Sequence, residues 1–368
     1  MAEETPINRS SWWPGAAFAA LIFILALSVR GYRISDIQPH HDESPAFGFS
    51  RGDPLEWTGS PAEFLSALFD NAEMITEGDS PPMICVVGEL FRYFFGENLT
   101  AARWFHALIQ SAGVALTAWL AWRIFRPVWA PIFAVGVLAV FSIPSIVFGQ
   151  FGEVYAIHFT AGVIQYLFYW TVLRTRYRWR DYLVFAVISY FCGLFGYLQV
   201  LIPAGLLLSS VCERGGLGRG SRILRGGVAF LLYGVLNAMP FFYFVVRTTF
   251  SGVFRHYYSA YYPPPGGEAL AGWVTYLLTR SYDLFNYHLS LVFDPRFYQP
   301  LEWNWFSLPF ILAAAGAIIL YFSGRHGRSR GIISALICLL IVFLAANLLR
   351  LVPYGGLRNT LFIAPAIW

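Results

Sequence analysis

Residues 15–29 read GAAFAALIFILALSV, a continuous apolar run that decides the fold. Two tryptophans and a proline precede it, Arg30 and Arg33 follow it, and no small-residue cleavage site lies near its end. These flanks are typical of a retained membrane anchor and not of a signal peptide. With 57% hydrophobic, 18% aromatic and 12% charged residues, the 368-residue chain is too apolar for a soluble protein, so we predict a polytopic membrane protein.

Apolar runs long enough to cross the hydrocarbon layer, about 20 residues each, recur along the chain. We predict one all-α transmembrane domain over residues 1–368, with about nine or ten crossings. Residues 182–211 are too long for one crossing and have arginine-rich flanks on both sides, so we expect a hairpin of two short helices broken around 193–196. Residues 360–368 make half a crossing, so either the chain stops within the membrane or, as we expect, the sequence is a piece of a longer protein. The other predicted crossings are 15–29, 101–122, 128–148, a span ending at Leu173, 226–246, 306–322 and 331–349.

Arginine-rich loops alternate with acidic ones, and this alternation predicts the orientation. The basic loops fall at 123–126, 174–180, 214–225 and 325–330, and the positive-inside rule places them on the cytoplasmic side with the N-terminus. Of the 21 acidic residues, only Glu3, Glu4, Asp181 and Glu213 then lie inside. We therefore expect an integral membrane protein whose carboxylate chemistry takes place on the periplasmic or lumenal side. The bacterial inner membrane is the expected location.

Several classes of function receive no support from the sequence. The net charge of +4 gives no indication of nucleic acid as a partner. The four cysteines are far apart and form neither a disulfide framework nor a zinc-binding spacing. No GxGxxG motif follows a strand, so a nucleotide loop is not indicated.

A long first outer loop, residues 33–99, is expected to carry helices of its own. Ser60-Pro61-Ala62-Glu63 is a capping box with proline at the first helical position, and its helix should lie along the membrane surface. A second helix is expected over 83–95, ending at Gly96. Residues 247–303 form a second outer loop rich in tyrosine, a composition most typical of interfacial anchors.

The first outer loop also contains the sequence HHDESP at residues 40–45, which follows the first span. Carboxylates beside a bilayer lose water, so they raise their pKa or take a cation, and Asp42 and Glu43 are therefore candidates for function. The alternative is a solvated loop charge. Arg103 lies in the first turn of the second span, where a cation opposes the helix dipole, so we expect it to have an anionic partner.

Taken in order, these motifs resemble the GT-C superfamily of membrane glycosyltransferases, especially the branch with protein O-mannosyltransferases and the lipid A aminoarabinose transferase. The resemblance covers essentially the whole chain. The matching segments are His41-Asp42-Glu43-Ser44, Asp79-Ser80-Pro81-Pro82-Met83, residues 94–103, residues 150–156, and Arg358-Asn359-Thr360-Leu361 with Pro365.

The resemblance implies a reaction outside the membrane, in which a sugar leaves a polyprenyl or dolichyl phosphate and is transferred, with inversion, to a lipid, glycan or protein acceptor. It assigns the general base to Asp42. Glu43 is expected either to orient the acceptor or to bind a divalent cation with Asp42, and both alternatives stay open. A cofactor beyond that cation is not implied.

The leaving lipid phosphate needs fixed positive charge, because negative charge grows on it in the transition state. Arg358 is the first candidate and Arg103 the second, since the planar guanidinium suits phosphate. Glu153 is either a second acid or a structural partner of Arg103. His41, Asp79 and Tyr155 lie in the same motifs and are expected to bind substrate.

Two other classes of function stay open. The first is a lipid-linked sugar flippase or transporter, which should carry polar groups inside several spans. These spans show very few polar residues in sequence, so we prefer the transferase. The second is an inactive membrane scaffold of the same fold.

Overall fold

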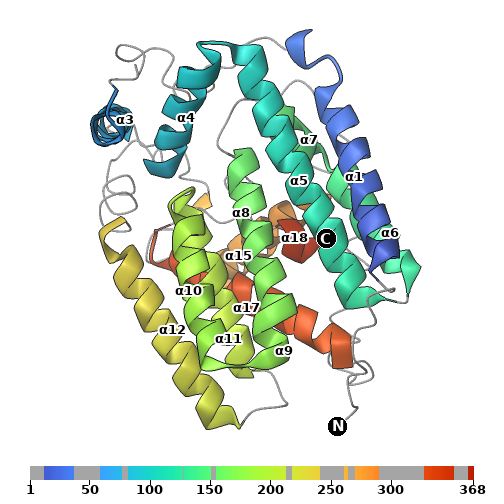
Figure 1. The fold of residues 1–368 in the computed structure, drawn as a ribbon. Helices are drawn as coiled ribbons and strands as arrows, with labels where there is room; N and C mark the ends of the chain where they lie inside the picture. The colour runs from blue at the N-terminus through green and yellow to red at the C-terminus, as the bar shows by residue number, and fades with distance from the viewer. Residues whose placement is uncertain are drawn as a thin grey trace.

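The computed structural model describes ten parts of the chain, which are mostly helical and contain no strand. They are residues 12–36, 59–76, 82–126, 128–150, 155–212, 218–240, 261–263, 270–289, 327–351 and 364–368. The predicted all-α class is therefore confirmed for the described residues (Figure 1).

The helices follow one another along the chain with short breaks. In order they are α1 (Trp13–Gly31), η2 (Ile34–Asp36), α3 (Pro61–Thr76), α4 (Pro82–Phe95), α5 (Leu99–Phe125), α6 (Trp129–Phe141), α7 (Ile143–Gln150), α8 (Tyr155–Phe168), η3 (Tyr169–Leu173), α9 (Arg174–Arg176), α10 (Trp179–Gly193), η4 (Tyr197–Val200), α11 (Leu201–Cys212), α12 (Arg219–Pro240), α15 (Leu270–Leu289), α17 (Gly327–Leu348) and α18 (Ala364–Ile367).

Four helices in the described part are long and apolar enough to cross a membrane, which fits an integral membrane protein. They span Trp13–Asp36, Leu99–Phe125, Tyr155–Arg176 and Gly331–Leu348. The predicted crossing at 128–148 is broken: α6 and α7 meet at an angle of 45°, and together they would count as a fifth span. The larger number of crossings stays a prediction.

The hairpin expected within 182–211 is confirmed. Helix α10 ends at Gly193, and the short η4 leads into α11. Gly226 of α12 faces both Tyr182, near the start of α10, and Val211, near the end of α11, so the two helices run in opposite directions and both pack on α12. The break needs glycine at Gly196, because a Cβ atom there would lie 2.7 Å from the His158 ring.

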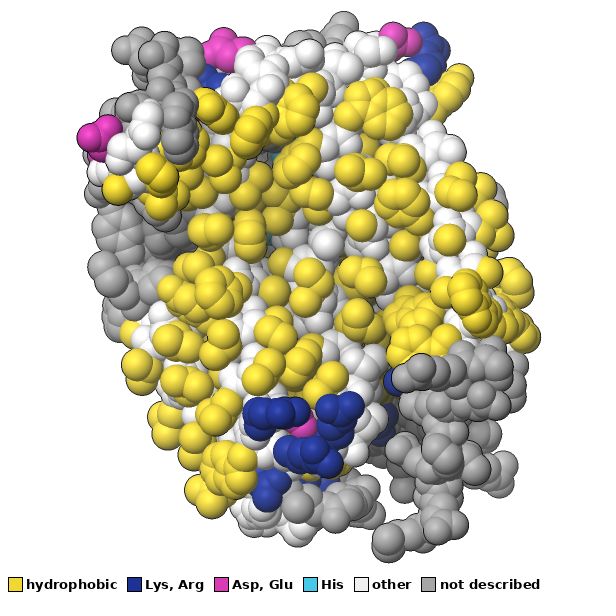
Figure 2. Space-filling model, in the orientation of Figure 1, with side chains coloured by type: hydrophobic (Ala, Val, Ile, Leu, Met, Phe, Trp, Pro, Cys, Tyr) yellow, Lys and Arg dark blue, Asp and Glu magenta, His cyan; other side chains and the backbone are white. Residues whose placement is uncertain are grey.

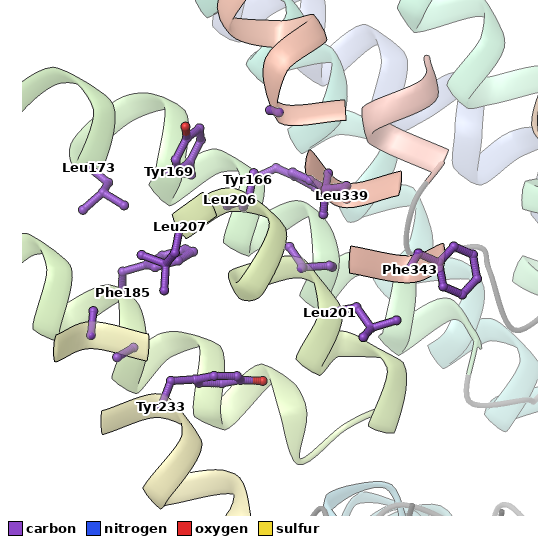
Figure 3. Close-up of a cluster of buried hydrophobic side chains, with 14 of the residues drawn as sticks. Tyr166, Tyr169, Leu173, Phe185, Leu201, Leu206, Leu207, Tyr233, Leu339 and Phe343 are labelled. Atoms are coloured by element: carbon purple, nitrogen blue, oxygen red, sulfur yellow. The ribbon is translucent and has the colours of Figure 1, made fainter. Parts of the chain in front are cut away.

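Two hydrophobic cores hold the bundle together. The larger lies between α5, α8, η3, α10, α11, α12, α15 and α17. Phe185, Leu206 and Leu339 are among its side chains labelled in Figure 3. The second joins α1, α5, α6 and α8 and includes Phe18 and Val114. Both clusters run through the apolar faces of several helices, so the helices are positioned by packing as well as by their hydropathy.

The two helices predicted in the first outer loop are present. Helix α3 begins at Pro61, and the Glu63 amide donates to Ser60 Oγ at 3.5 Å, as the capping box requires. Helix α4 ends before Gly96, whose φ of 64° is in the left-handed region that favours glycine. Figure 1 views α3 nearly end-on, whereas α4 lies more nearly along the bundle.

Helices α3 and α4 pack against each other through Leu68 and Val86. The Met83 amide of α4 donates to the Leu194 carbonyl at the tip of the α10–α11 hairpin, at 3.3 Å. This backbone bond joins the first outer loop to the membrane bundle.

A further helix lies within the region expected to be the second outer loop. Helix α15 is 20 residues long, and its Leu284 belongs to the larger core while Tyr287 belongs to the second. Helix α18, from the final apolar run, packs nearby: the Trp368 indole donates to the His288 carbonyl at 2.8 Å. This part of the chain therefore contributes to the interior of the bundle.

Candidate functional site

Six of the eight residues expected to form the site lie outside the described residues. They are His41, Asp42, Glu43, Asp79, Glu153 and Arg358. The structure describes the other two, Arg103 and Tyr155.

Arg103 is buried at the end of α5 that adjoins the first outer loop. Asn98 caps this helix, accepting a hydrogen bond from the Ala101 amide at 3.0 Å, so the first turn is fixed. The Arg103 side chain is only 2% exposed, and its Nη1 donates to the Ile34 carbonyl of η2 at 3.2 Å. A guanidinium cation is thus held where the first span passes into the loop that carries Asp42.

A buried polar stripe continues from Arg103 along α5. His106 is 2% exposed and Gln110 is fully buried. Residues three and seven positions after Arg103 project from the same face of a helix, so these three side chains form one line into the bundle. Intramembrane polar residues of this kind are costly and usually mark function.

Arg30 joins this stripe from α1. Its side chain is fully buried and donates to three oxygens: the Ala26 carbonyl at 3.2 Å, the Ala139 carbonyl at 3.3 Å and Ser145 Oγ at 2.7 Å. Gln110 Nε2 also donates to Ser145 Oγ, at 3.2 Å. Ser145 is therefore the point at which α1, α5 and α7 are joined.

These contacts explain how the α6–α7 break is tolerated. Pro144 has no amide hydrogen, and the bend frees carbonyl oxygens at the end of α6. Arg30 Nη2 and Ser145 Oγ both donate to the Ala139 carbonyl, at 3.3 Å and 3.5 Å. Non-helical backbone at membrane depth is stable only when other protein groups satisfy it in this way.

The approach of α7 to this network depends on Gly149. A Cβ atom there would lie 2.1 Å from Gln110 Oε1 and 2.9 Å from Arg30 Nε. Any larger residue would push these side chains away, so this packing of α7 on Gln110 and Arg30 requires glycine at position 149.

Tyr155 opens α8, the neighbour of α5. Its ring packs on Phe148 at 5.2 Å and on His158 at 5.8 Å, both edge-on. Thr160, five residues further along α8, donates from its hydroxyl to the Ile109 carbonyl of α5 at 2.9 Å. The first turns of α8 therefore pack on α5, and the role expected for Tyr155 stays a prediction.

Sequence reasoning missed a charged group on α4. Glu89 is fully buried, with an oxygen 3.7 Å from Arg92 Nη1, and Arg92 Nη2 lies 3.3 Å from Glu97. The Phe91 and Phe105 rings pack at 5.5 Å, which fixes α4 against the same end of α5. The signal was the Glu–Arg pair at a spacing of three on an amphipathic helix.

A second missed group lies between α8 and the hairpin. Gln165 Nε2 donates to Gln199 Oε1 at 2.9 Å, and Gln199 Nε2 donates to the His158 carbonyl at 2.5 Å. With Arg30 and Gln110, these residues show that the spans contain more polar groups than we expected. The error arose because isolated polar residues barely alter the mean hydropathy of an apolar run.

The described residues include one guanidinium of the proposed site, that of Arg103, and this group is of a kind suited to phosphate. Arg30 is already held by three protein oxygens. Among the described ranges, three His, Cys, Asp or Glu side chains nowhere come together as metal ligands, and the expected ligands Asp42 and Glu43 lie outside those ranges.

The chain matches no protein-family model, no curated protein and no solved structure. The described residues themselves define the class: an all-helical protein with apolar helices of membrane-crossing length and buried cationic side chains near the first outer loop.

Proposed function

We propose that this protein is a membrane glycosyltransferase that moves a sugar from a polyprenyl-phosphate donor to a lipid, glycan or protein acceptor. The observation that carries the proposal is the buried Arg103, held by the Ile34 carbonyl at the start of the loop that contains the acidic pair. Ile34 lies eight residues before Asp42 in the sequence, and Tyr155 lies two residues after Glu153. Two described residues, Ile34 and Tyr155, therefore lie close in sequence to proposed catalytic residues.

The proposed reaction is a direct displacement at the anomeric carbon. The acceptor oxygen forms a bond to this carbon as the bond to the donor phosphate breaks, and the acceptor proton passes to Asp42. A positioned general base of this kind contributes about 100-fold to 10,000-fold in rate. Glu43 orients the acceptor or holds a divalent cation with Asp42.

The leaving polyprenyl phosphate gains negative charge as the bond breaks, and Arg358 and Arg103 are the proposed cations that stabilise it. His41, Asp79 and Tyr155 are proposed to contact donor or acceptor. Glu153 is proposed as a second acid or as a partner of Arg103.

The test is sugar transfer by purified protein from a panel of radiolabelled polyprenyl-phosphate sugars. The wild type is compared with Asp42→Asn and with a matched control, Asp36→Asn, because the Asp36 side chain is 56% exposed and lies at the same end of α1. Loss of transfer in Asp42→Asn alone supports the base mechanism. If EDTA also abolishes transfer by the wild type, the reaction requires a divalent cation. Equal transfer by Asp42→Asn and wild type would remove Asp42 from the mechanism.

A lipid-linked sugar transporter is the second candidate function. The observations that favour it are the broken α6–α7 span and the polar groups buried inside several helices. Proteoliposomes separate the two functions: a transporter moves the labelled donor lipid across the bilayer intact, whereas a transferase gives a labelled acceptor. If the protein does neither, and Asp42→Asn leaves cells unchanged, the inactive scaffold is favoured.

A further inference from the structure

One end of the bundle carries a surplus of arginine. Arg174, Arg176, Arg178 and Arg180 fall within seven residues where α9 passes into α10, and all but Arg174 are exposed. Figure 2 shows basic side chains gathered at this end. The described residues of this end include a single acid, Asp181, which is only 3% exposed. The exposed charge of this arginine patch, residues 174–180, is therefore positive throughout.

Tryptophan rings stack with arginine side chains around the same end of the bundle. Tryptophan is enriched at the headgroup level of membranes, so a guanidinium stacked on it lies near the depth of lipid phosphates. The described residues include four such pairs, with these distances from guanidinium carbon to ring centre: Arg123 on Trp12 at 5.3 Å, Arg126 on Trp122 at 5.2 Å, Arg174 on Trp170 at 4.3 Å and Arg225 on Trp179 at 5.6 Å.

Helix α12 brings two more arginines beside the patch. Arg225 donates to the Tyr177 carbonyl, between α9 and α10. Arg222, one turn earlier, is 5% exposed, and its Nε and Nη1 have no hydrogen-bond acceptor among the described residues. Buried donors are almost always paired, so these two groups indicate an acceptor that the described chain does not supply.

We propose that this end of the protein binds the headgroup phosphate of an anionic phospholipid between the arginine patch and the start of α12. Clusters of four to eight basic residues at the ends of membrane helices attract anionic lipids. The guanidinium fork can bind a phosphate through two parallel hydrogen bonds. The proposal concerns the end of the bundle opposite Arg103 and does not rest on the proposed transfer reaction.

The test follows thermal unfolding of the full chain, purified in detergent, during titration with phosphatidylglycerol or with phosphatidylcholine of the same acyl chains. We expect a saturable rise in Tm with phosphatidylglycerol alone, and weakening of this effect by salt. Arg176→Gln and Arg180→Gln should each weaken the apparent affinity for phosphatidylglycerol about fivefold. Both side chains are exposed, so folding is checked by the Tm without added lipid.

The matched control is Arg33→Gln, which removes an exposed arginine from the opposite end and should leave the lipid affinity unchanged. Equal stabilisation by the two lipids would overturn the proposal, as would an equal loss of affinity in Arg33→Gln and Arg176→Gln. If inorganic phosphate raises the Tm as far as phosphatidylglycerol does, the site takes free phosphate and the lipid assignment is wrong.

Discussion

Arg30 of α1 donates a 2.7 Å hydrogen bond to Ser145 Oγ of α7, across the interior of the bundle. Arg30 looks in sequence like a charge that flanks the first span, yet the structure buries it completely. The bond joins the first span to α7, beyond the α6–α7 bend. Gln110 of α5 also donates a hydrogen bond to Ser145 Oγ. The network therefore joins α1, α5 and α7 through one serine side chain.

Ser145→Ala should destabilise the protein, because it leaves donors of Arg30 and Gln110 buried without their shared acceptor. The expected loss is about 1 to 3 kcal/mol. Thermal unfolding of purified protein in detergent measures it as a lower Tm. The matched control is Thr175→Ala, whose hydroxyl is exposed and bonds only to its own helix region. If Ser145→Ala has the wild-type Tm, the hydrogen bonds to Ser145 contribute little to the free energy of unfolding.

Gly149→Ala should be more disruptive than its single methyl group suggests. The added Cβ would lie 2.1 Å from Gln110 Oε1, so α7 must move away or Gln110 must leave Ser145. We expect a loss of about 1 to 3 kcal/mol, the cost of overpacking. Gly234→Ala in α12 is the control, because nothing lies within 4 Å of that position and alanine favours helix by up to about 1 kcal/mol.

A double variant tests whether the Gly149 effect arises from the proposed clash. In Gly149→Ala with Gln110→Ala, the side-chain oxygen is gone, so the two losses should be less than additive. Strict additivity of the changes in Tm would assign the effect of Gly149→Ala to the backbone instead.

Arg103→Gln should lower transfer from a polyprenyl-phosphate sugar, if the proposed reaction is correct. Loss of one stabilising donor typically costs about 100-fold to 1,000-fold in kcat. Arg103→Lys should recover part of the rate, because it restores the charge without the planar fork. Since Arg103 is 2% exposed, the Tm of each variant is measured in parallel. A folded Arg103→Gln protein with the wild-type kcat would exclude a role for Arg103 in stabilising the leaving group.

Asn98→Ala should lower stability by about 1 kcal/mol, because the amide of Ala101 loses its cap. Exposed Asn98 lies outside the polar stripe, so the rate of transfer per folded molecule should stay at the wild-type value. A change in kcat without a change in Tm would show that the start of α5 acts on the substrate directly.

Much of the fold was predictable wherever one strong local signal decided the outcome. The capping box at Ser60 and the glycine at Gly96 predicted the start of α3 and the end of α4. The 30-residue apolar run at 182–211 could be accommodated only by two short helices, and its glycines located the break.

The features that sequence did not reveal depend on contacts between distant segments. Pro144 was visible, but the apolar length of 128–148 favoured a single span, and only the packing of Arg30 shows how the bend is stabilised. Arg103 donates to the Ile34 carbonyl, and the anionic partner expected for it stays a prediction. The acidic pair of the candidate site lies outside the described residues and stays a prediction.

The Arg30 network also has a consequence for biosynthesis. Its partners on the broken span are made 109 and 115 residues later than Arg30 itself. At about 5 to 20 residues per second, the ribosome needs on the order of ten seconds to reach them. During that interval the first span must be inserted with its guanidinium satisfied by water or lipid headgroups. Only after α7 has been made can this cation bond to all three of its protein acceptors.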